Sequence, residues 1–196
     1  MTPSSIHHRH SIRLPGYDYS QPGDYFITIC AYEHKWVFGE IVNYESDLSP
    51  LGILAQKCWM EIPEHFMGIE LGVFVIMPNH IHGIITISAD ENTKISCRGT
   101  VYPSFIRACR APTIHNSINE QFGKPVSGSI PTIIRAYKSA VTCTNNKQNG
   151  TPGAPVRQRN YYEHIIETEK EYLTIEAYIE NNPANWPNDQ LWAAKT

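Results

Sequence analysis

The stretch IELGVFVIMPNHIHGIITIS, residues 69–88, decides the fold of this chain. Its two halves, 69–77 and 80–88, are apolar nearly throughout and rich in Val and Ile. Runs of this length and composition are typical of β-strands. Only the dipeptide Pro78-Asn79 separates them, and such a dipeptide indicates a turn. The stretch therefore predicts two neighbouring antiparallel strands.

Two histidines, His80 and His82, stand at the start of the second strand with one residue between them. Side chains alternate along a strand, so both imidazoles point to the same side, with their Cα atoms about 7 Å apart. Two imidazoles at that spacing are able to share one divalent metal ion. On spacing alone two ordinary core or surface histidines are the favoured interpretation, and a metal site stays open as the alternative at this point.

Apolar periodicity predicts further elements on both sides of this stretch. They are a strand at 23–32, a helix at 48–66, a helix at 131–146, a strand at 156–166 and a helix at 168–183. The order strand, helix, strand, strand, helix, strand, helix begins as the split β-α-β plan. We therefore predict an α+β fold: a ferredoxin-like sandwich, in which an antiparallel sheet carries helices on one face.

Local signals mark the ends of two helices. Ser49-Pro50 supplies an N-cap and first turn for one helix. Thr168 and Glu171 form the Thr-x-x-Glu capping box at the start of the last one. Pro183 prevents continuation of that helix, which is expected to end near Asn182.

The chain of 196 residues fits one domain with an insertion. We expect a polar and basic arm at 1–22, the domain at 23–187 and a tail at 188–196. Within the domain, residues 89–130 lose all periodicity and are interpreted as a flexible insertion.

Bulk composition excludes several classes of protein. No apolar run reaches the roughly 18 residues of a membrane span, and the first 25 residues lack the apolar core of a signal peptide, so a cytoplasmic protein is expected. Five widely spaced cysteines without a Cys-x-x-Cys pair argue against a thiolate zinc site and a disulfide framework, and predict free thiols.

The net charge of −3 hides a strong segregation of charge. Residues 91–162 hold ten basic and two acidic side chains, whereas the rest of the chain holds six and seventeen. Such a basic segment is able to neutralise phosphates even in a slightly acidic protein. A solvated, flexible charged insertion explains the same pattern.

The last predicted helix adds two polar side chains with suitable chemistry. Tyr178 and Asn182 are four residues apart and therefore share one helical face. The tyrosine could supply a nucleophile and the asparagine an oxygen ligand. The alternative for Tyr178 is a half-buried aromatic residue that anchors the helix.

Taken together, MPNHIHGIIT, QRNYYEHII and YIENNP, with SIRLPGYDYSQPGDYFITIC ahead of them, resemble the HUH single-tyrosine transposases, related to insertion-sequence enzymes. Within that family they look most like the REP-associated tyrosine transposases. The resemblance covers about residues 9–88 and 131–187. It does not cover 89–130. One departure is Arg157, where the family usually has tryptophan before QRNYYEHII.

The resemblance implies a ferredoxin-like fold and assigns roles residue by residue. His80 and His82 align with the metal-binding histidine pair, Asn182 with the third ligand and Tyr178 with the nucleophile. The implied cofactor is a divalent metal, Mg²⁺ or Mn²⁺. Candidate phosphate contacts in the basic segment are Arg135, Lys138, Arg157 and Arg159. The rival tyrosines Tyr161 and Tyr162 lie in the strand-like block.

The implied activity is cleavage and rejoining of single-stranded or hairpin DNA, such as palindromic repeats, through a 5′-phosphotyrosine link. The monomer is slightly favoured over a homodimer. Two alternatives remain: a catalytically inactive nucleic-acid-binding module on the same fold, and a metal-dependent nuclease that forms no covalent intermediate.

Overall fold

The computed structural model describes residues 14, 16–89 and 126–192. A four-stranded sheet with the order β4-β5-β1-β6 forms its centre, and every neighbouring pair is antiparallel. The strands are β1 (Gly23–Cys30), β4 (Ile69–Ile76), β5 (His80–Ile87) and β6 (Tyr162–Ile166). This order is that of a ferredoxin-like sheet, so the predicted α+β fold is confirmed.

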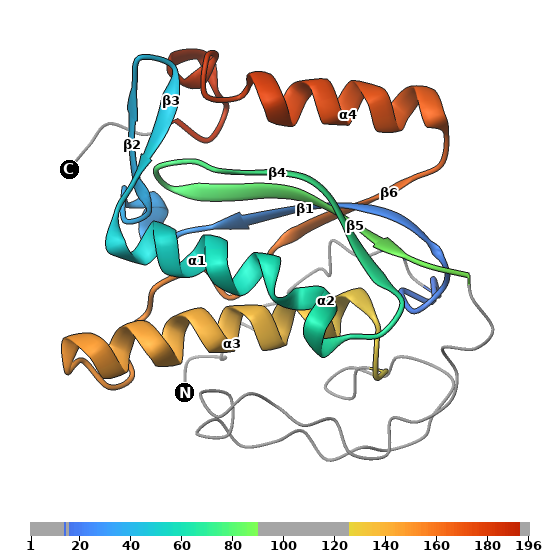
Figure 1. Ribbon diagram of the computed structural model, residues 1–196, viewed down its shortest axis with the longest axis horizontal. Coiled ribbons are helices and arrows are strands. Elements are labelled where there is room, and N and C mark those ends of the chain that lie inside the picture. The colour runs from blue at the N-terminus through green and yellow to red at the C-terminus, as the bar shows by residue number, and fades with distance from the viewer. Residues whose placement is uncertain (1–13, 15, 90–125, 193–196) are drawn as a thin grey trace, which may run out of the picture.

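Helices cover both faces of the sheet (Figure 1). Three of them lie on one face: α1 (Pro50–Met60), α2 (Ile62–His65) and α3 (Ile130–Asn149). The fourth, α4 (Glu169–Asn181), lies on the opposite face. The expectation that all helices share one face is therefore wrong for α4. The physical reason is visible in β4 and β5, because nearly continuous apolar runs belong to strands that are buried on both sides.

The face under α1 and α3 carries the larger core. Alternate residues of β1 and β5 point into it and meet the aromatic side chains of the helices. Trp59 of α1 is fully buried, and its ring contacts that of Tyr137 edge-on at 5.2 Å between centroids. Gly83 makes room for it, since a Cβ at this position would lie 2.5 Å from the Trp59 ring. Burial of an aromatic pair contributes several kcal/mol.

The face under α4 carries a smaller core, which fixes that helix on the sheet. Four buried residues form it: Phe26, Ile84, Ile166 and Ile179. Thr28 and His82 are direct partners across β1 and β5 and lie on this same face. The α4 side of the sheet is therefore the side that holds the histidine pair.

Side-chain caps define the starts of two helices, as the sequence predicts. Ser49 Oγ accepts a hydrogen bond from the Gly52 amide at 3.0 Å. Thr168 Oγ1 accepts one from the Glu171 amide at 3.2 Å. Each such cap stabilises its helix by about 1 kcal/mol. The helix α3 ends at Asn149, and the next residue, Gly150, has a φ of 64°, in the left-handed region typical of a helix C-terminus.

Several element boundaries differ from those predicted. The helix expected at 48–66 divides at Glu61 into α1 and α2. The strand expected at 156–166 is regular only in β6, and in its first part Arg157 forms an isolated bridge with Ala31, the residue after β1. A hairpin of β2 (Gly39–Val42) and β3 (Glu45–Leu48) was not anticipated.

Some expectations fall mostly outside the described residues. The insertion at 89–130 lies there except for residue 89 and residues 126–130, and so does most of the arm at 1–22. Among the described helices, none has the length and apolar character needed to cross a membrane. Cys30 and Cys58 are free thiols as predicted. Cys143 is disulfide-bonded, so the expectation of free thiols is wrong for that residue.

Candidate functional site

The two histidines of β5 lie side by side beneath α4. Their ring centroids are 4.4 Å apart. His80 is 0% exposed and His82 is 3% exposed. Both side chains therefore point to the same side of the sheet, as predicted, and both are buried.

His80 is oriented by Asn79, the residue before it. His80 Nδ1 lies 2.7 Å from Asn79 Oδ1, which accepts but cannot donate, so Nδ1 carries the proton. The lone pair of this imidazole is consequently on Nε2. That Nε2 atom is buried and has no hydrogen-bond partner. An imidazole that donates from one nitrogen and leaves the other bare has the arrangement found in metal-binding histidines.

His82 is held in the same way by β1. Thr28 Oγ1 lies 2.8 Å from His82 Nδ1, and the Phe26 ring stacks on the imidazole at 5.3 Å between centroids. The Nε2 atom of His82 points toward α4, where it lies 3.2 Å from the hydroxyl of Tyr178. The structure thus brings the predicted nucleophile against the predicted metal ligands.

Tyr178 sits at the border between core and solvent. It is 46% exposed, and the edge of its ring meets Phe26 and His82. Partial burial and the neighbouring Asp189 carboxylate raise the pKa of the phenol above its ordinary value. The hydroxyl is therefore protonated at neutral pH and must lose its proton to act as a nucleophile.

Asn182, one turn further along, is 2% exposed. Its Nδ2 donates to Asp189 Oδ2 at 2.9 Å. Its Oδ1 is buried without a hydrogen-bond partner. The predicted oxygen ligand therefore has a bare acceptor atom at the end of α4.

Asp189 is the residue that sequence reasoning missed, because it lies in the stretch interpreted as a tail. Its Oδ2 also lies 3.5 Å from the Tyr178 hydroxyl. Ligand atoms of His80, His82 and Asp189 all lie within 4.8 Å of one another, so this cluster could hold a metal ion. A signal was present in the sequence: Leu191 and Trp192 follow the aspartate within that stretch, and large apolar side chains seldom occur in a free tail.

Electrostatics favour the neutral form of both imidazoles. Burial lowers the pKa of His80 to about 4, against the opposing charge of Asp189. Burial and the neighbouring His80 lower the pKa of His82 well below its ordinary value. Neutral imidazole is the form that binds metal ions. Both histidines are thus ready to act as ligands at neutral pH.

The four basic residues proposed as phosphate contacts differ in position. Arg135 and Arg159 are exposed. Lys138 is 3% exposed, and its Nζ donates to the carbonyls of Arg159 and Asn160, at 3.0 Å each. Arg157 is partly buried, and its Nε donates to the Lys138 carbonyl at 3.0 Å. Lys138 and Arg157 therefore stabilise the segment before β6, and the two exposed arginines present their charge to solvent.

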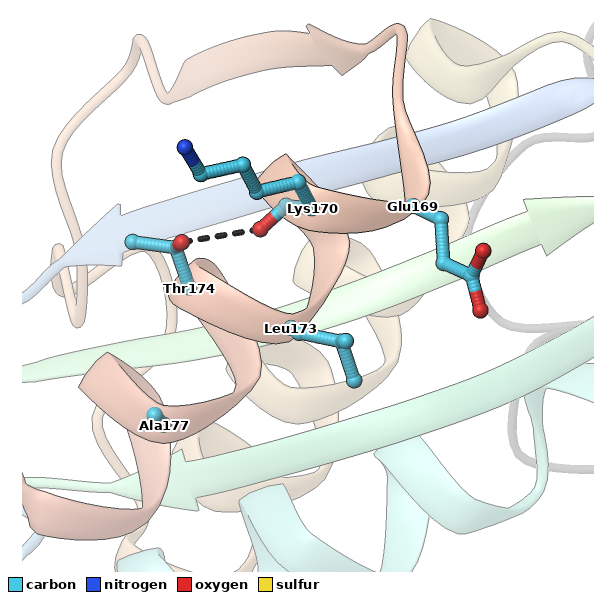
Figure 2. Close-up of a pocket in the computed structure, with 5 residues that line it drawn as sticks. All are labelled: Glu169, Lys170, Leu173, Thr174 and Ala177. Atoms are coloured by element: carbon cyan, nitrogen blue, oxygen red, sulfur yellow. Dashed lines mark hydrogen bonds between the residues drawn. The ribbon is translucent and has the colours of Figure 1, made fainter.

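A surface hollow of about 590 Å³ lies on the outer side of α4 (Figure 2). Five residues line it: Glu169, Lys170, Leu173, Thr174 and Ala177. Thr174 Oγ1 is bonded back to the Lys170 carbonyl at 2.8 Å. None of these side chains belongs to the histidine cluster, so the hollow is separate from the candidate site.

Comparison with known proteins agrees with the fold. No family model matches the chain. A solved REP-associated tyrosine transposase bound to a REP hairpin has a similar structure, with a TM-score of 0.55 and 14% sequence identity, over 91% of this chain and 74% of that one. The likeness supports a transposase-like fold. An uncharacterised protein of Haemophilus influenzae is 43% identical over 189 residues, which are 96% of either chain. The chain belongs to the same family as that Haemophilus influenzae protein.

Proposed function

We propose that this protein cleaves and rejoins single-stranded or hairpin DNA through a 5′-phosphotyrosine intermediate on Tyr178. The reaction uses a divalent metal ion, Mg²⁺ or Mn²⁺. This is the chemistry of a transposase or a REP-associated transposase. The observation that carries the proposal is the 3.2 Å separation between the Tyr178 hydroxyl and His82 Nε2.

The side chains around the histidine pair fit a divalent ion. His80 Nε2 and Asn182 Oδ1 are buried acceptor atoms without hydrogen-bond partners. A buried acceptor left unpaired costs about 1–3 kcal/mol, and a cation between these atoms would remove that cost. His80, His82 and Asn182 would hold the ion. When bound, the ion supplies a positive charge that polarises the scissile phosphate.

The proposed cleavage step balances without a further reagent. The Tyr178 oxygen forms a bond to phosphorus, and the bond from phosphorus to the 3′-oxygen breaks. The phenol loses one proton and the leaving 3′-oxygen gains one. Because His82 Nε2 would bind the ion, Asp189 Oδ2, 3.5 Å from the phenol oxygen, is the acceptor for that proton. Because the ester energy is kept in the phosphotyrosine, a second 3′-hydroxyl reverses the step and rejoins strands without ATP.

Exposed positive charge and aromatic rings suit a nucleic-acid strand. Arg135 and Arg159 are exposed, and Tyr162 is 50% exposed beside Phe26 on the α4 side of the sheet. Phosphate contacts supply affinity, and aromatic side chains stack on unpaired bases. We include these residues in the proposed DNA surface. One chain contains both the tyrosine and the histidines, which suits action as a monomer.

The direct test is covalent trapping. The full chain is incubated with a labelled hairpin oligonucleotide and Mn²⁺ and then run on a denaturing gel. The proposal requires a protein–DNA band that is absent for Tyr178→Phe. Tyr44→Phe is the matched control, because it removes the hydroxyl of an exposed tyrosine outside the proposed DNA surface and should leave the band intact.

The same experiment separates the two alternatives. If the protein is an inactive binding module, wild type and Tyr178→Phe would bind the hairpin equally well, and neither would form an adduct. A nuclease without a covalent intermediate would release free ends and keep its activity in Tyr178→Phe. Either result contradicts the proposed function.

A further inference from the structure

We propose that Asp189 is a direct oxygen ligand of the metal ion, so that the segment 183–192 completes the centre begun by β5 and α4. This inference rests on the proposed function, because it concerns the same ion. It adds a ligand from a part of the chain that the family resemblance does not assign. It also makes the donor set two imidazoles, the Asn182 amide oxygen and one carboxylate.

The first argument is position. An Asp189 carboxylate oxygen and a ring nitrogen from each of His80 and His82 all lie within 4.8 Å of one another. Ligands of one ion at about 2.0–2.2 Å from it lie at most about 4.4 Å apart, which is slightly less than this limit. A small side-chain adjustment therefore brings the three atoms onto one centre.

The second argument is the pair of unsatisfied atoms beside the carboxylate. His80 Nε2 and Asn182 Oδ1 are buried acceptors, and neither residue exceeds 2% exposure. Asp189 offers only further acceptor oxygens, so it cannot satisfy them. A cation surrounded by these atoms satisfies all of them together.

The third argument is charge. Both imidazoles and the Asn182 amide are neutral, so a divalent ion held by them alone would place two uncompensated positive charges in a buried site. Burial of an unpaired charge costs several kcal/mol. The Asp189 carboxylate halves that charge and leaves one positive charge to attract a phosphate.

The fourth argument is that the aspartate is held in place from its own segment. Its Oδ1 accepts from the Leu191 amide at 2.6 Å, and the Leu191 carbonyl accepts from Asn79 Nδ2 at 2.8 Å. Trp186 is 4% exposed and packs its ring near His80, at 5.8 Å between centroids. Asn79, which orients His80, thus also fixes the segment that carries Asp189. Such outer-sphere contacts are typical of metal sites.

The test is Mn²⁺ affinity, measured by isothermal titration calorimetry on the full chain without DNA. Asp189→Asn keeps the size of the side chain and removes its charge. We expect it to weaken Mn²⁺ binding more than 100-fold, because loss of an outer-sphere partner alone costs 10- to 100-fold. Asp47→Asn, which alters an exposed aspartate of β3, should bind as wild type does. His82→Ala should abolish binding.

Two outcomes of the titration would contradict the proposal, and the thermal midpoint serves as the control for folding. If His82→Ala loses Mn²⁺ while Asp189→Asn binds within twofold of wild type, Asp189 is not a ligand, and the histidine centre of the proposed function still stands. If wild type binds no Mn²⁺, both ideas fail. The thermal midpoint without metal shows whether Asp189→Asn is folded. Mn²⁺ should raise the thermal midpoint of wild type. An Asp189→Ala variant whose midpoint without metal equals that of wild type should lose most of this rise.

Discussion

The side chain of Asn79 joins His80 to Leu191, a residue 112 positions further along the chain. Its Oδ1 accepts from His80 Nδ1 at 2.7 Å, and its Nδ2 donates to the Leu191 carbonyl at 2.8 Å. One amide therefore fixes the direction of an imidazole and anchors the segment that carries Asp189. Asn79 is 0% exposed, so water cannot replace these bonds.

Asn79→Ala should weaken metal binding. Without the Oδ1 acceptor, His80 loses the bond that places its proton on Nδ1 and its lone pair toward the site. We expect a 10- to 100-fold loss of Mn²⁺ affinity by calorimetric titration, the usual cost of removing such a partner. Asn149→Ala, at the exposed end of α3, is the control. Equal affinities for both variants would show that Asn79 does not orient a ligand.

The donor set should prefer Mn²⁺ to Mg²⁺. Imidazole nitrogen suits first-row transition ions, whereas Mg²⁺ favours oxygen ligands and retains its water. Competition of Mg²⁺ against bound Mn²⁺, followed by the electron paramagnetic resonance signal of free Mn²⁺, measures the ratio. We expect Mn²⁺ to bind at least tenfold more tightly. Displacement at equal concentrations of the two ions would contradict this.

Arg159 should contribute to DNA affinity through charge. Because its side chain is exposed, Arg159→Gln should weaken binding of a hairpin oligonucleotide and lower the slope of log affinity against log salt by about 0.7–0.9, the effect of one lost phosphate contact. Fluorescence anisotropy over a series of salt concentrations measures both. Lys147→Gln, on the exposed end of α3, is a control for nonspecific charge, and an identical change in slope there would refute a specific contact.

Lys138 should make stability depend on pH. Burial, with the nearby Arg157, lowers the pKa of its ammonium to about 7 in the folded protein, against an ordinary value of 10.5. Between these values the unfolded chain binds more protons than the folded one, so raising the pH favours folding. Relative to Lys138→Met, wild type should gain about 2 kcal/mol of unfolding free energy between pH 7 and pH 9. Urea denaturation at the two pH values measures the difference. If the difference in unfolding free energy between wild type and Lys138→Met is the same at pH 7 and pH 9, the pKa of Lys138 in the folded protein is not lowered as stated.

The strands and helices around the sheet were predictable from local pattern. β4 and β5 follow from continuous apolar runs on either side of Pro78-Asn79. The capping residues Ser49 and Thr168 mark the true starts of α1 and α4. These features depend on neighbours within a few residues, which the sequence displays directly.

The hairpin of β2 and β3 escaped because it lacks such signals. Each strand has four residues, and both carry acidic side chains. Its turn uses Asn43 and Tyr44, with φ of 52° and 65°, rather than a glycine. Tyrosine rarely adopts a positive φ, so propensity argued against a turn there.

The candidate site was predictable in part. The His-x-His pair and the Tyr178–Asn182 spacing each follow from the period of one element. Asp189 reaches the site by tertiary folding, after Pro183 ends α4 and the chain turns back, and no periodicity records that path. The burial of Lys138 was hidden for the same reason, because the carbonyls of Arg159 and Asn160 come from another segment.

The most direct test of the proposed function is the chemical identity of the DNA-linked residue. The adduct formed with a hairpin oligonucleotide and Mn²⁺ is digested with protease and nuclease, and the peptides are sequenced by tandem mass spectrometry. The proposed mechanism predicts a nucleotide phosphate on the Tyr178 oxygen. A modification on Tyr161 or Tyr162, or complete cleavage of the DNA with every tyrosine unmodified, would contradict it.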